Sequence, residues 1–386
     1  MARRIRLVCT ATAIVPIALL AAACSSSSST TSAASSAPAS TSAASAAATA
    51  SAAASPSIPA APSSGTLTET GSSVMFPLVS EWQKGYTAQY PGIKISTAST
   101  NSGTGITDAG QGLVNIGTSD AYLSASQTAQ YPTLENIPTG VNAIEVVYNL
   151  PSLTAPLNLS GTVLAQIYDG KITTWNDPAI AKLNSGVSLP STKIVTVHRA
   201  DSSGSTVLFA QYLNAQDATD WPSTLVASSP TWPKTSGALA ETGSGAMVTG
   251  AGSTVGSIAY IGTSYASKIK AAKLTAAAVL NGAGKYTTAT PASLTAAVAS
   301  FPAAPASGSE SLINTSAAAG YGITGYEYAD VNVKQSSTAQ ADLIQNFLYW
   351  AITTGSSSSY LGKVDFVALP TATYNVAVNL ITKISG

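Results

Sequence analysis

Apolar residues recur every three or four positions between Phe76 and Tyr90. This spacing places them on one face of a helix, and the Pro91–Gly92 pair that follows predicts where the helix ends. The Ile93–Ile95 segment, in which a lysine separates two isoleucines, indicates that a strand comes next.

From Thr66 onward the chain consists of short apolar runs separated by clusters of Gly, Pro, Asn and Ser. Such runs predict strands at Ala143–Tyr148, Ile194–Val197, Ser257–Ile261 and Val364–Val367. Helical spacing predicts helices at Thr162–Tyr168, Thr206–Leu213 and Ala339–Ile352. Because strands alternate with helices, we expect an α/β fold. The length of 386 residues is more than one compact core usually covers, so two lobes are expected.

Charged residues make up only 9% of the chain, and 17 Lys and Arg balance 17 Asp and Glu. A nucleic-acid binder needs a basic face to neutralise phosphates, so we expect no nucleic-acid partner. One histidine, His198, and two cysteines, Cys9 and Cys24, are too few for a usual zinc site or a multi-disulfide scaffold. These counts argue against a metal-dependent hydrolase.

The N-terminus has the layout of a signal peptide. Three arginines precede the mostly apolar stretch Leu7–Leu20, and small residues then lead to Cys24. The apolar stretch is shorter than the roughly 20 residues of a membrane-spanning helix, so we expect residues 1–23 to be a cleaved signal. The cysteine after small residues resembles a bacterial lipobox, which implies that Cys24 is lipidated.

Residues 24–64 are nearly all Ser, Ala, Thr and Pro. Such a segment cannot bury enough apolar surface to offset its chain entropy. We therefore expect a disordered tether that holds the folded body away from a membrane or cell wall.

Three loops rich in glycine and hydroxyl residues each precede a predicted helix. They are Gly71–Pro77, Asn101–Ile106 and Arg199–Thr206. Helix N-termini present unpaired N–H groups and a partial positive charge to an anion. Taken alone, each loop is better explained by helix caps and turns. The presence of all three favours an anion site.

Three charged residues can contribute to such a site. The planar fork of Arg199 suits a tetrahedral oxyanion, and Asp201 can hold the guanidinium in place, although the pair is equally typical of a structural salt bridge. Asp120 ends an apolar stretch and is either a helix cap or an acceptor for a ligand.

These segments resemble those of the PstS family, the phosphate-binding proteins of the bacterial ABC phosphate importer, in its lipid-anchored actinobacterial form. The resemblance covers about residues 66–386. It rests on an ordered set of motifs at Glu69–Ser73, Tyr90–Gly92, Ser102–Ile106, Asn115–Ser124, Thr174–Pro178 and His198–Gly204. The chain departs from the family at Ser202, where glycine is usual, and at Ser205, where threonine or aspartate is frequent.

The resemblance implies a two-lobed α/β fold of the periplasmic-binding-protein-like type II, with a ligand cleft between lobes joined by two crossover strands. Lobe I is expected at 65–143 and 323–386, and lobe II at 144–322. The family's phosphate contacts correspond to Ser72, Ser73, Val74, Ser102, Asp120, Arg199, Ser203, Gly204 and Ser205, with Asp201 supporting the arginine.

The same resemblance implies a function. The protein is expected to capture inorganic phosphate and deliver it to the ABC permease subunits in the membrane, with no cofactor, no metal and no enzymatic activity. It is expected to be an extracytoplasmic monomer, attached to the cell membrane through its lipid only. Phosphate keeps a proton near neutral pH that an ionised Asp120 can accept, whereas sulfate has none. A site that pairs a ligand's donor can reject an analogue without it by about 10⁴ to 10⁵.

Alternative functions are a secreted serine hydrolase or phosphatase, a surface adhesin with the same fold, and a binder of another tetrahedral oxyanion. A hydrolase is disfavoured because the chain has no G-x-S-x-G motif. Its only histidine, His198, also adjoins Arg199, which lowers the basicity of the imidazole. His198 is expected to be a packing or supporting residue.

Overall fold

The computed structural model describes residues 57–153 and 155–386. The predicted signal peptide, Cys24 and most of the predicted tether lie outside the described residues. Within the predicted tether, Ile58 already packs against the folded body, and the Pro59 carbonyl accepts a hydrogen bond from Asn346 Nδ2 at 2.9 Å.

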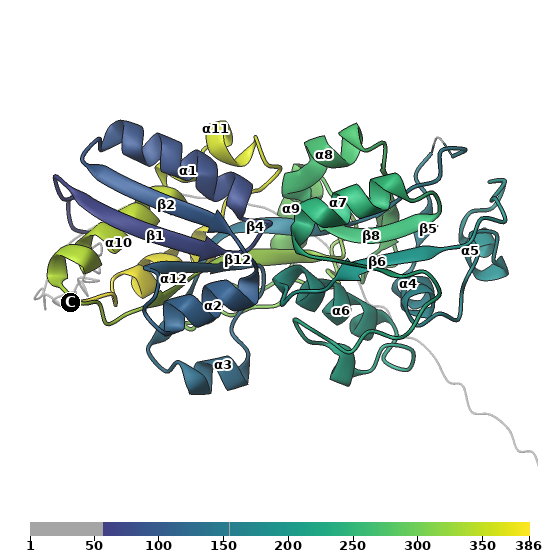
Figure 1. The fold of residues 1–386 in the computed structure, drawn as a ribbon, viewed down its shortest axis with the longest axis horizontal. Coiled ribbons are helices and arrows are strands. Elements are labelled where there is room, and N and C mark those ends of the chain that lie inside the picture. Colours follow the sequence, from purple (N-terminus) through teal and green to yellow (C-terminus); the bar gives the residue numbers. More distant parts are fainter. Residues whose placement is uncertain (1–56, 154) are drawn as a thin grey trace, which may run out of the picture. The chain divides into compact units, whose positions relative to one another are not determined.

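One long mixed sheet forms the framework, in the order β2-β1-β3-β12-β4-β8-β6-β7, with β9 beside β4 (Figure 1). Its strands are β1 (Gly65–Gly71), β2 (Ile93–Ser99), β3 (Ile116–Ser119), β4 (Leu134–Tyr148), β6 (Val195–Arg199), β7 (Leu239–Glu241), β8 (Ser257–Gly262), β9 (Thr275–Ala276) and β12 (Thr324–Asn332). A smaller sheet contains β5 (Asn158–Leu159), β10 (Ala278–Leu280) and β11 (Tyr286–Thr287).

Helices pack against both ends of the long sheet (Figure 1). Near β1 and β2 these are α1 (Phe76–Gln89), α2 (Ser102–Gly110), α3 (Ala125–Gln130), α10 (Thr338–Ile352), α11 (Ser358–Leu361) and α12 (Thr371–Ile381). Near β6 and β8 they are α4 (Gly161–Tyr168), α5 (Pro178–Leu183), α6 (Gly204–Gln216), α7 (Gly243–Ser253) and α8 (Ala266–Ala271), whereas α9 (Pro291–Val298) packs against β4 and β12.

Two main hydrophobic clusters lie at the two ends of the sheet, and we use lobe I and lobe II for the elements around each. The lobe I cluster includes Trp82 and Phe347, and the lobe II cluster includes Trp175 and Phe209. Within each lobe, strands pair in parallel, β1 with β2 and β3 in lobe I and β6 with β7 and β8 in lobe II. Parallel strands with covering helices are typical of an α/β fold.

Two long antiparallel strands, β4 and β12, connect the lobes (Figure 1). Along β4, Ile137 packs in the lobe I cluster and Ile144 in the lobe II cluster. Along β12 and just before it, Val331 packs in lobe I and Ile323 in lobe II. The predicted two-lobed α/β fold with two crossover strands is therefore confirmed.

Most of the predicted elements are confirmed. The helix predicted from Phe76 is α1, which buries Leu78, Val79 and Trp82 and ends where the Tyr90 N–H donates to the Tyr86 carbonyl. The other predicted helices lie within α4, α6 and α10, and the predicted strands before residue 262 fall in β2, β4, β6 and β8.

The strand predicted at Val364–Val367 is wrong. The Val364 and Phe366 N–H groups both donate to the Leu361 carbonyl, and Asp365 has a positive φ of 56°, so the backbone turns here. Only Val367 makes a strand-like bridge, to Val141. The run is apolar because Val364 and Phe366 fill the lobe I core, and burial alone does not distinguish a turn from a strand.

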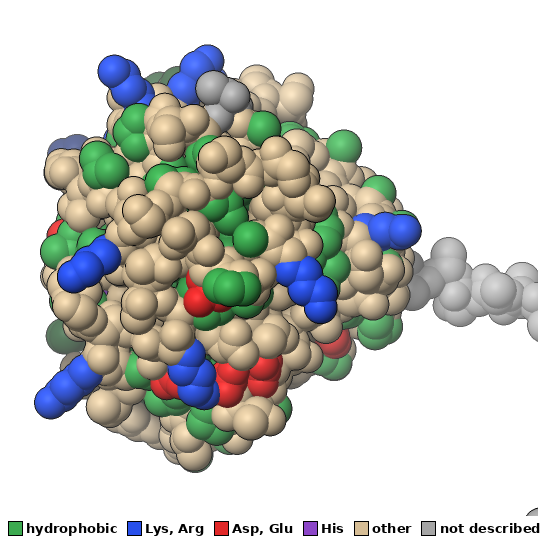
Figure 2. Space-filling model, turned by 90° about the vertical axis from the view of Figure 1, so that its right-hand side faces the viewer, with side chains coloured by type: hydrophobic (Ala, Val, Ile, Leu, Met, Phe, Trp, Pro, Cys, Tyr) green, Lys and Arg blue, Asp and Glu red, His purple; other side chains and the backbone are tan. Residues whose placement is uncertain are grey.

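Charged side chains are sparse on the surface. Figure 2 shows one face of the molecule, on which Lys and Arg side chains are scattered and one of them lies against a group of Asp and Glu side chains. This face offers no basic stripe of the kind that nucleic-acid binding requires.

Several carboxyl groups are instead buried within the long sheet. Burial raises the pKa of Glu69 and of Asp330 to about 7. Burial, with a contribution from the nearby Asp365 carboxylate, raises the pKa of Glu145 to about 7 as well. The Glu69 carboxylate accepts a hydrogen bond from Thr118 Oγ1 at 2.8 Å, which links β1 to β3.

The hydroxyl group of Tyr86 tests the packing of lobe I. It donates to Asn346 Oδ1 at 2.8 Å from a fully buried ring. We expect Tyr86→Phe to lower the free energy of unfolding by about 1–2 kcal/mol in urea denaturation, because the amide oxygen loses its donor. Tyr90→Phe is the control: Tyr90 follows α1, and its hydroxyl only accepts an exposed hydrogen bond from Gln89 Nε2, so this change should alter the free energy of unfolding by less than about 0.5 kcal/mol. Equal effects of both changes would contradict this packing.

The burial of Glu69 predicts a pH dependence of stability. Its pKa is about 7 in the folded chain against an ordinary 4.5, so the folded state binds more protons between these values and stability falls as pH rises through this window. Glu69→Gln removes the ionisable group and therefore this loss of stability at higher pH. The free energy of unfolding of the variant relative to wild type should therefore increase by on the order of 2 kcal/mol from pH 5 to pH 8. Parallel stability curves for the two proteins would show that Glu69 ionises normally.

Candidate functional site

The three Gly- and Ser-rich loops identified in the sequence meet between the lobes. Lobe I contributes the segment between β1 and α1 and the N-terminus of α2, and lobe II contributes the N-termini of α6 and α7. Hydrogen bonds from Gly204 N to Ser102 Oγ (3.1 Å) and from Ser244 N to Ser73 Oγ (3.1 Å) connect the two sides. Helix N-termini that converge in this way make a region rich in N–H donors.

The lobe I side is built around Ser72. Its hydroxyl accepts from the N–H groups of Val74 (3.0 Å) and Met75 (3.1 Å), while its own N–H donates to Thr118 Oγ1 at 3.0 Å. The preceding Gly71 has a φ of +149°, and a Cβ there would lie 2.3 Å from the Thr118 carbonyl oxygen. Only glycine fits this position, so it fixes the path of the chain into the site.

Asp120 directly follows β3 and is almost completely buried. Its carboxylate accepts hydrogen bonds from the hydroxyls of Ser72 in lobe I and Ser205 in lobe II. Asp120 is therefore the acceptor that the two lobes share, and it does not cap a helix.

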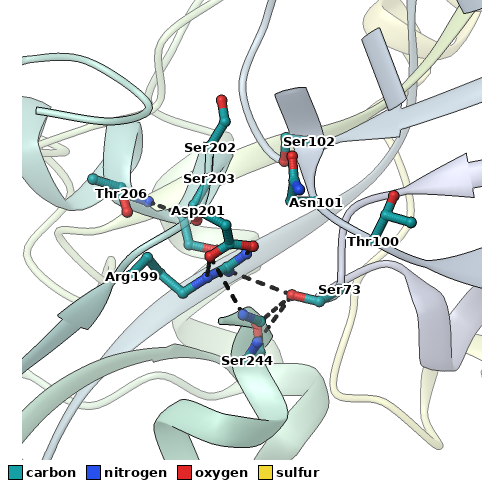
Figure 3. A network of polar contacts seen from close by, with 12 residues as sticks. Ser73, Thr100, Asn101, Ser102, Arg199, Asp201, Ser202, Ser203, Thr206 and Ser244 are labelled. Carbon is teal, nitrogen blue, oxygen red and sulfur yellow. Dashed lines mark hydrogen bonds and ion pairs between the residues drawn. The ribbon is translucent and has the colours of Figure 1, made fainter. Parts of the chain in front are cut away.

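Arg199 ends β6 and is 4% exposed. Its Nε and Nη2 atoms donate to the two carboxylate oxygens of Asp201, each at 2.5 Å, and its Nη1 points to Ser73 Oγ at 3.4 Å (Figure 3). Burial opposes its charge, but the hydrogen bonds and charge of Asp201, with the nearby Asp120, raise the pKa of Arg199. The Arg199–Asp201 salt bridge therefore orients the guanidinium. Asp201 holds one of its edges, and the other edge faces lobe I.

The N-terminus of α6 lies very close to Asp120. Ser203 caps the helix by accepting from the Thr206 N–H at 3.3 Å. At Gly204, a Cβ would lie 2.8 Å from the Asp120 backbone nitrogen and 2.9 Å from that of Ala121. A larger residue would therefore hold the lobes apart at this point.

The structure brings together the site residues predicted from the sequence. They are Ser72, Ser73, Val74, Ser102, Asp120, Arg199, Ser203, Gly204 and Ser205, with Asp201 beside the arginine. Ser202 and Ser205, the two residues at which the chain departs from the family pattern, point in different directions. Ser205 faces Asp120, whereas the Ser202 hydroxyl donates away from the site to Ser228 Oγ at 2.8 Å.

Sequence reasoning missed two residues of this region. Ser244, near the start of α7, exchanges hydrogen bonds with Ser73, and its only sequence signal is another Gly/Ser cluster at the start of a helix, Thr242–Gly245. Glu327 on β12 is fully buried beside Asp120 and has no local sequence signal.

His198 has the packing role expected from the sequence. Its half-buried ring lies against Trp232 with centroids 4.7 Å apart, and burial lowers the pKa of the imidazole.

The chemistry of the site follows from these groups. Helix N–H groups, serine hydroxyls and one guanidinium supply donors, and Asp120 supplies an acceptor. Within the described residues, no cluster of His, Cys, Asp and Glu could hold a metal ion. The arrangement suits a small oxyanion that carries one proton.

Comparisons with known proteins agree with this geometry. Residues 29–354 match the PBP superfamily domain. Among curated proteins, the chain is 32% identical to the phosphate-binding protein PstS of Pasteurella multocida over 308 residues, which cover 79% of this chain and 86% of that protein. It is 31% identical to PstS of Methanocaldococcus jannaschii over 350 residues, or 85% of this chain and 89% of that protein.

A solved structure shows the same fold at lower identity. The periplasmic phosphate-binding protein PfluDING, solved with bound phosphate, has a TM-score of 0.65 and 22% sequence identity, with 81% of this chain and 92% of that chain covered. Given the domain match and the curated relatives, the chain belongs to the PstS family of phosphate-binding proteins within the PBP superfamily.

Proposed function

We propose that this protein binds inorganic phosphate between its two lobes at the site around Asp120 and Arg199. The observation that carries the proposal is the meeting of one buried carboxylate and one buried guanidinium at helix N-termini from both lobes. The relatives named as phosphate-binding proteins support it, as does the phosphate-bound structure with the same fold.

Each group has a distinct part in binding. Arg199 Nη1, the serine hydroxyls other than those of Ser72 and Ser205, which donate to Asp120, and the N–H groups of Val74 and Gly204 donate to phosphate oxygens. In the structure these groups bond to one another, as Gly204 N does to Ser102 Oγ, and phosphate would replace those partners. Asp120 accepts the remaining phosphate proton, and Asp201 holds the guanidinium in position.

Binding is proposed to couple to lobe movement. The lobes share β4 and β12, and the polar groups of each lobe contribute only part of the donor set. Phosphate that contacts both sides therefore favours the closed arrangement over the open one.

We further propose that the protein is an extracytoplasmic lipoprotein that delivers phosphate to an ABC permease. The lipobox-like sequence before Cys24 and the PstS relatives support this proposal. Among the helices of the described residues, none has the length and hydropathy needed to cross a membrane. The site residues hold the ligand and do not react with it, and we propose no enzymatic activity.

Replacement of the guanidinium tests its role directly. Arg199→Ala should weaken phosphate binding by at least about 1.5–3 kcal/mol in isothermal titration, because a charge-assisted contact is lost and Asp201 is left unpaired. Lys171→Ala, which removes a surface cation paired with Asp169 and Asp220, is the control and should bind as wild type does. An unchanged dissociation constant for Arg199→Ala would remove this residue from the site.

Asp120 is predicted to set the preference for phosphate over sulfate. Asp120→Asn replaces a charged acceptor with an amide that can also donate, so sulfate is no longer repelled. The ratio of sulfate to phosphate dissociation constants should fall by about tenfold or more, since unmatched polar groups are the source of such discrimination. If the ratio stays at its wild-type value, selectivity does not depend on Asp120 accepting the phosphate proton.

A further inference from the structure

The strand pairing places a second carboxyl group next to Asp120. Strands β3 and β12 are antiparallel with Tyr328 opposite Ser119, so the next residues along, Asp120 and Glu327, are neighbours. The pairing of β12 with β4 shifts register between Glu327 and Tyr328. Such bulges redirect a side chain and are frequent next to binding sites.

Glu327 is fully buried, and its two carboxyl oxygens have different surroundings. Oε1 accepts a hydrogen bond from Asn142 Nδ2 at 2.9 Å. Oε2 is reached by no donor in the part of the chain that the structure describes, and the strand register places the Asp120 carboxylate beside this side chain. Two buried carboxylates in contact repel each other, so one of the pair must keep a proton.

The surrounding groups decide which of the two keeps it. Asp120 accepts hydrogen bonds from the hydroxyls of Ser72 and Ser205 and lies near the positive charge of Arg199. Among the described residues, the neutral amide of Asn142 is the one hydrogen-bond donor to Glu327. Burial and the negative charge of Asp120 raise the pKa of Glu327 well above its ordinary range.

We propose that Glu327 is a positioning residue of the phosphate site, a neutral carboxylic acid whose Oε2–H donates a hydrogen bond to the Asp120 carboxylate. This inference rests on the proposed phosphate-binding function. A carboxylate has about four lone-pair positions, and Ser72, Ser205 and Glu327 together occupy three of them. Asp120 then has one remaining position for a ligand proton.

The anchoring of Glu327 connects Asp120 to both crossover strands. Asn142 lies on β4, and its Oδ1 accepts from the hydroxyl of Thr263, which follows β8 in lobe II. The chain of contacts therefore runs from Asp120 through β12 and β4 to the second lobe. In this arrangement Glu327 holds the Asp120 carboxylate on the side that faces the sheet, and the ligand reaches the carboxylate from the cleft.

Infrared difference spectroscopy of the full protein at pH 6 tests the protonation directly. Glu327→Gln should remove one carbonyl band of a protonated carboxylic acid. In an Asp120→Asn background the same band should appear at a shifted frequency, because the acceptor of its hydrogen bond has changed. Asp330→Asn is the matched control. It is another buried acid on β12, with Asn136 as its partner, and its band should not respond to Asp120→Asn.

Phosphate and sulfate titrations of the same proteins complete the test. Glu327→Gln keeps a neutral donor and should bind phosphate within about threefold of wild type. Glu327→Leu should weaken binding by about tenfold or more and reduce the preference over sulfate, because Asp120 loses a partner. A leucine variant as selective as wild type would contradict the proposal. If this variant does not fold, the spectra alone decide.

Two spectroscopic results would contradict the proposal. If Glu327→Gln removes no acid band, Glu327 is ionised and the proposal fails. If the band is present but does not respond to Asp120→Asn, its proton is not donated to Asp120 and the proposal also fails. A wild-type protein that bound no phosphate would overturn the proposed function, but it would leave the infrared result unaffected.

Discussion

A buried carboxylate that accepts hydrogen bonds from both lobes is the interaction on which the site depends. Asp120 receives the hydroxyls of Ser72 and Ser205, and Gly204 allows the α6 N-terminus to approach its backbone. An isolated buried charge would be strongly unfavourable, so the surrounding donors are a requirement of the fold as well as of binding. The same requirement explains why helix N-termini and a guanidinium gather at this point.

Low overall charge is compatible with anion binding because the charges that matter act at contact range. Arg199 is held by Asp201 at 2.5 Å and is almost fully buried, where screening by salt is weak. The nearby serine hydroxyls and backbone N–H groups add donors without adding net charge. In the proposed function, the site distinguishes anions by their hydrogen-bond pattern more than by net charge.

The sequence predicted those parts of the molecule that local pattern determines. The apolar face of α1 and the Gly-rich loop before α6 can be recognised from a few consecutive residues, because helix periodicity and capping residues are local features of the sequence. The ordered motifs then assigned the site residues through family resemblance. Val364–Val367 was predicted as a strand because its apolar residues are buried, but the positive φ at Asp365 makes it a turn. Glu327 was missed because its position beside Asp120 arises from the pairing of β3 with β12, which are distant in the chain.

The central claim is that this site binds phosphate and distinguishes it from sulfate by the proton. The most direct test is isothermal titration of the wild-type protein, purified free of bound anion, with phosphate and then with sulfate at the same pH. We expect tight one-to-one binding of phosphate and no heat from sulfate. Binding of sulfate as tight as that of phosphate, or no binding of either, would contradict it.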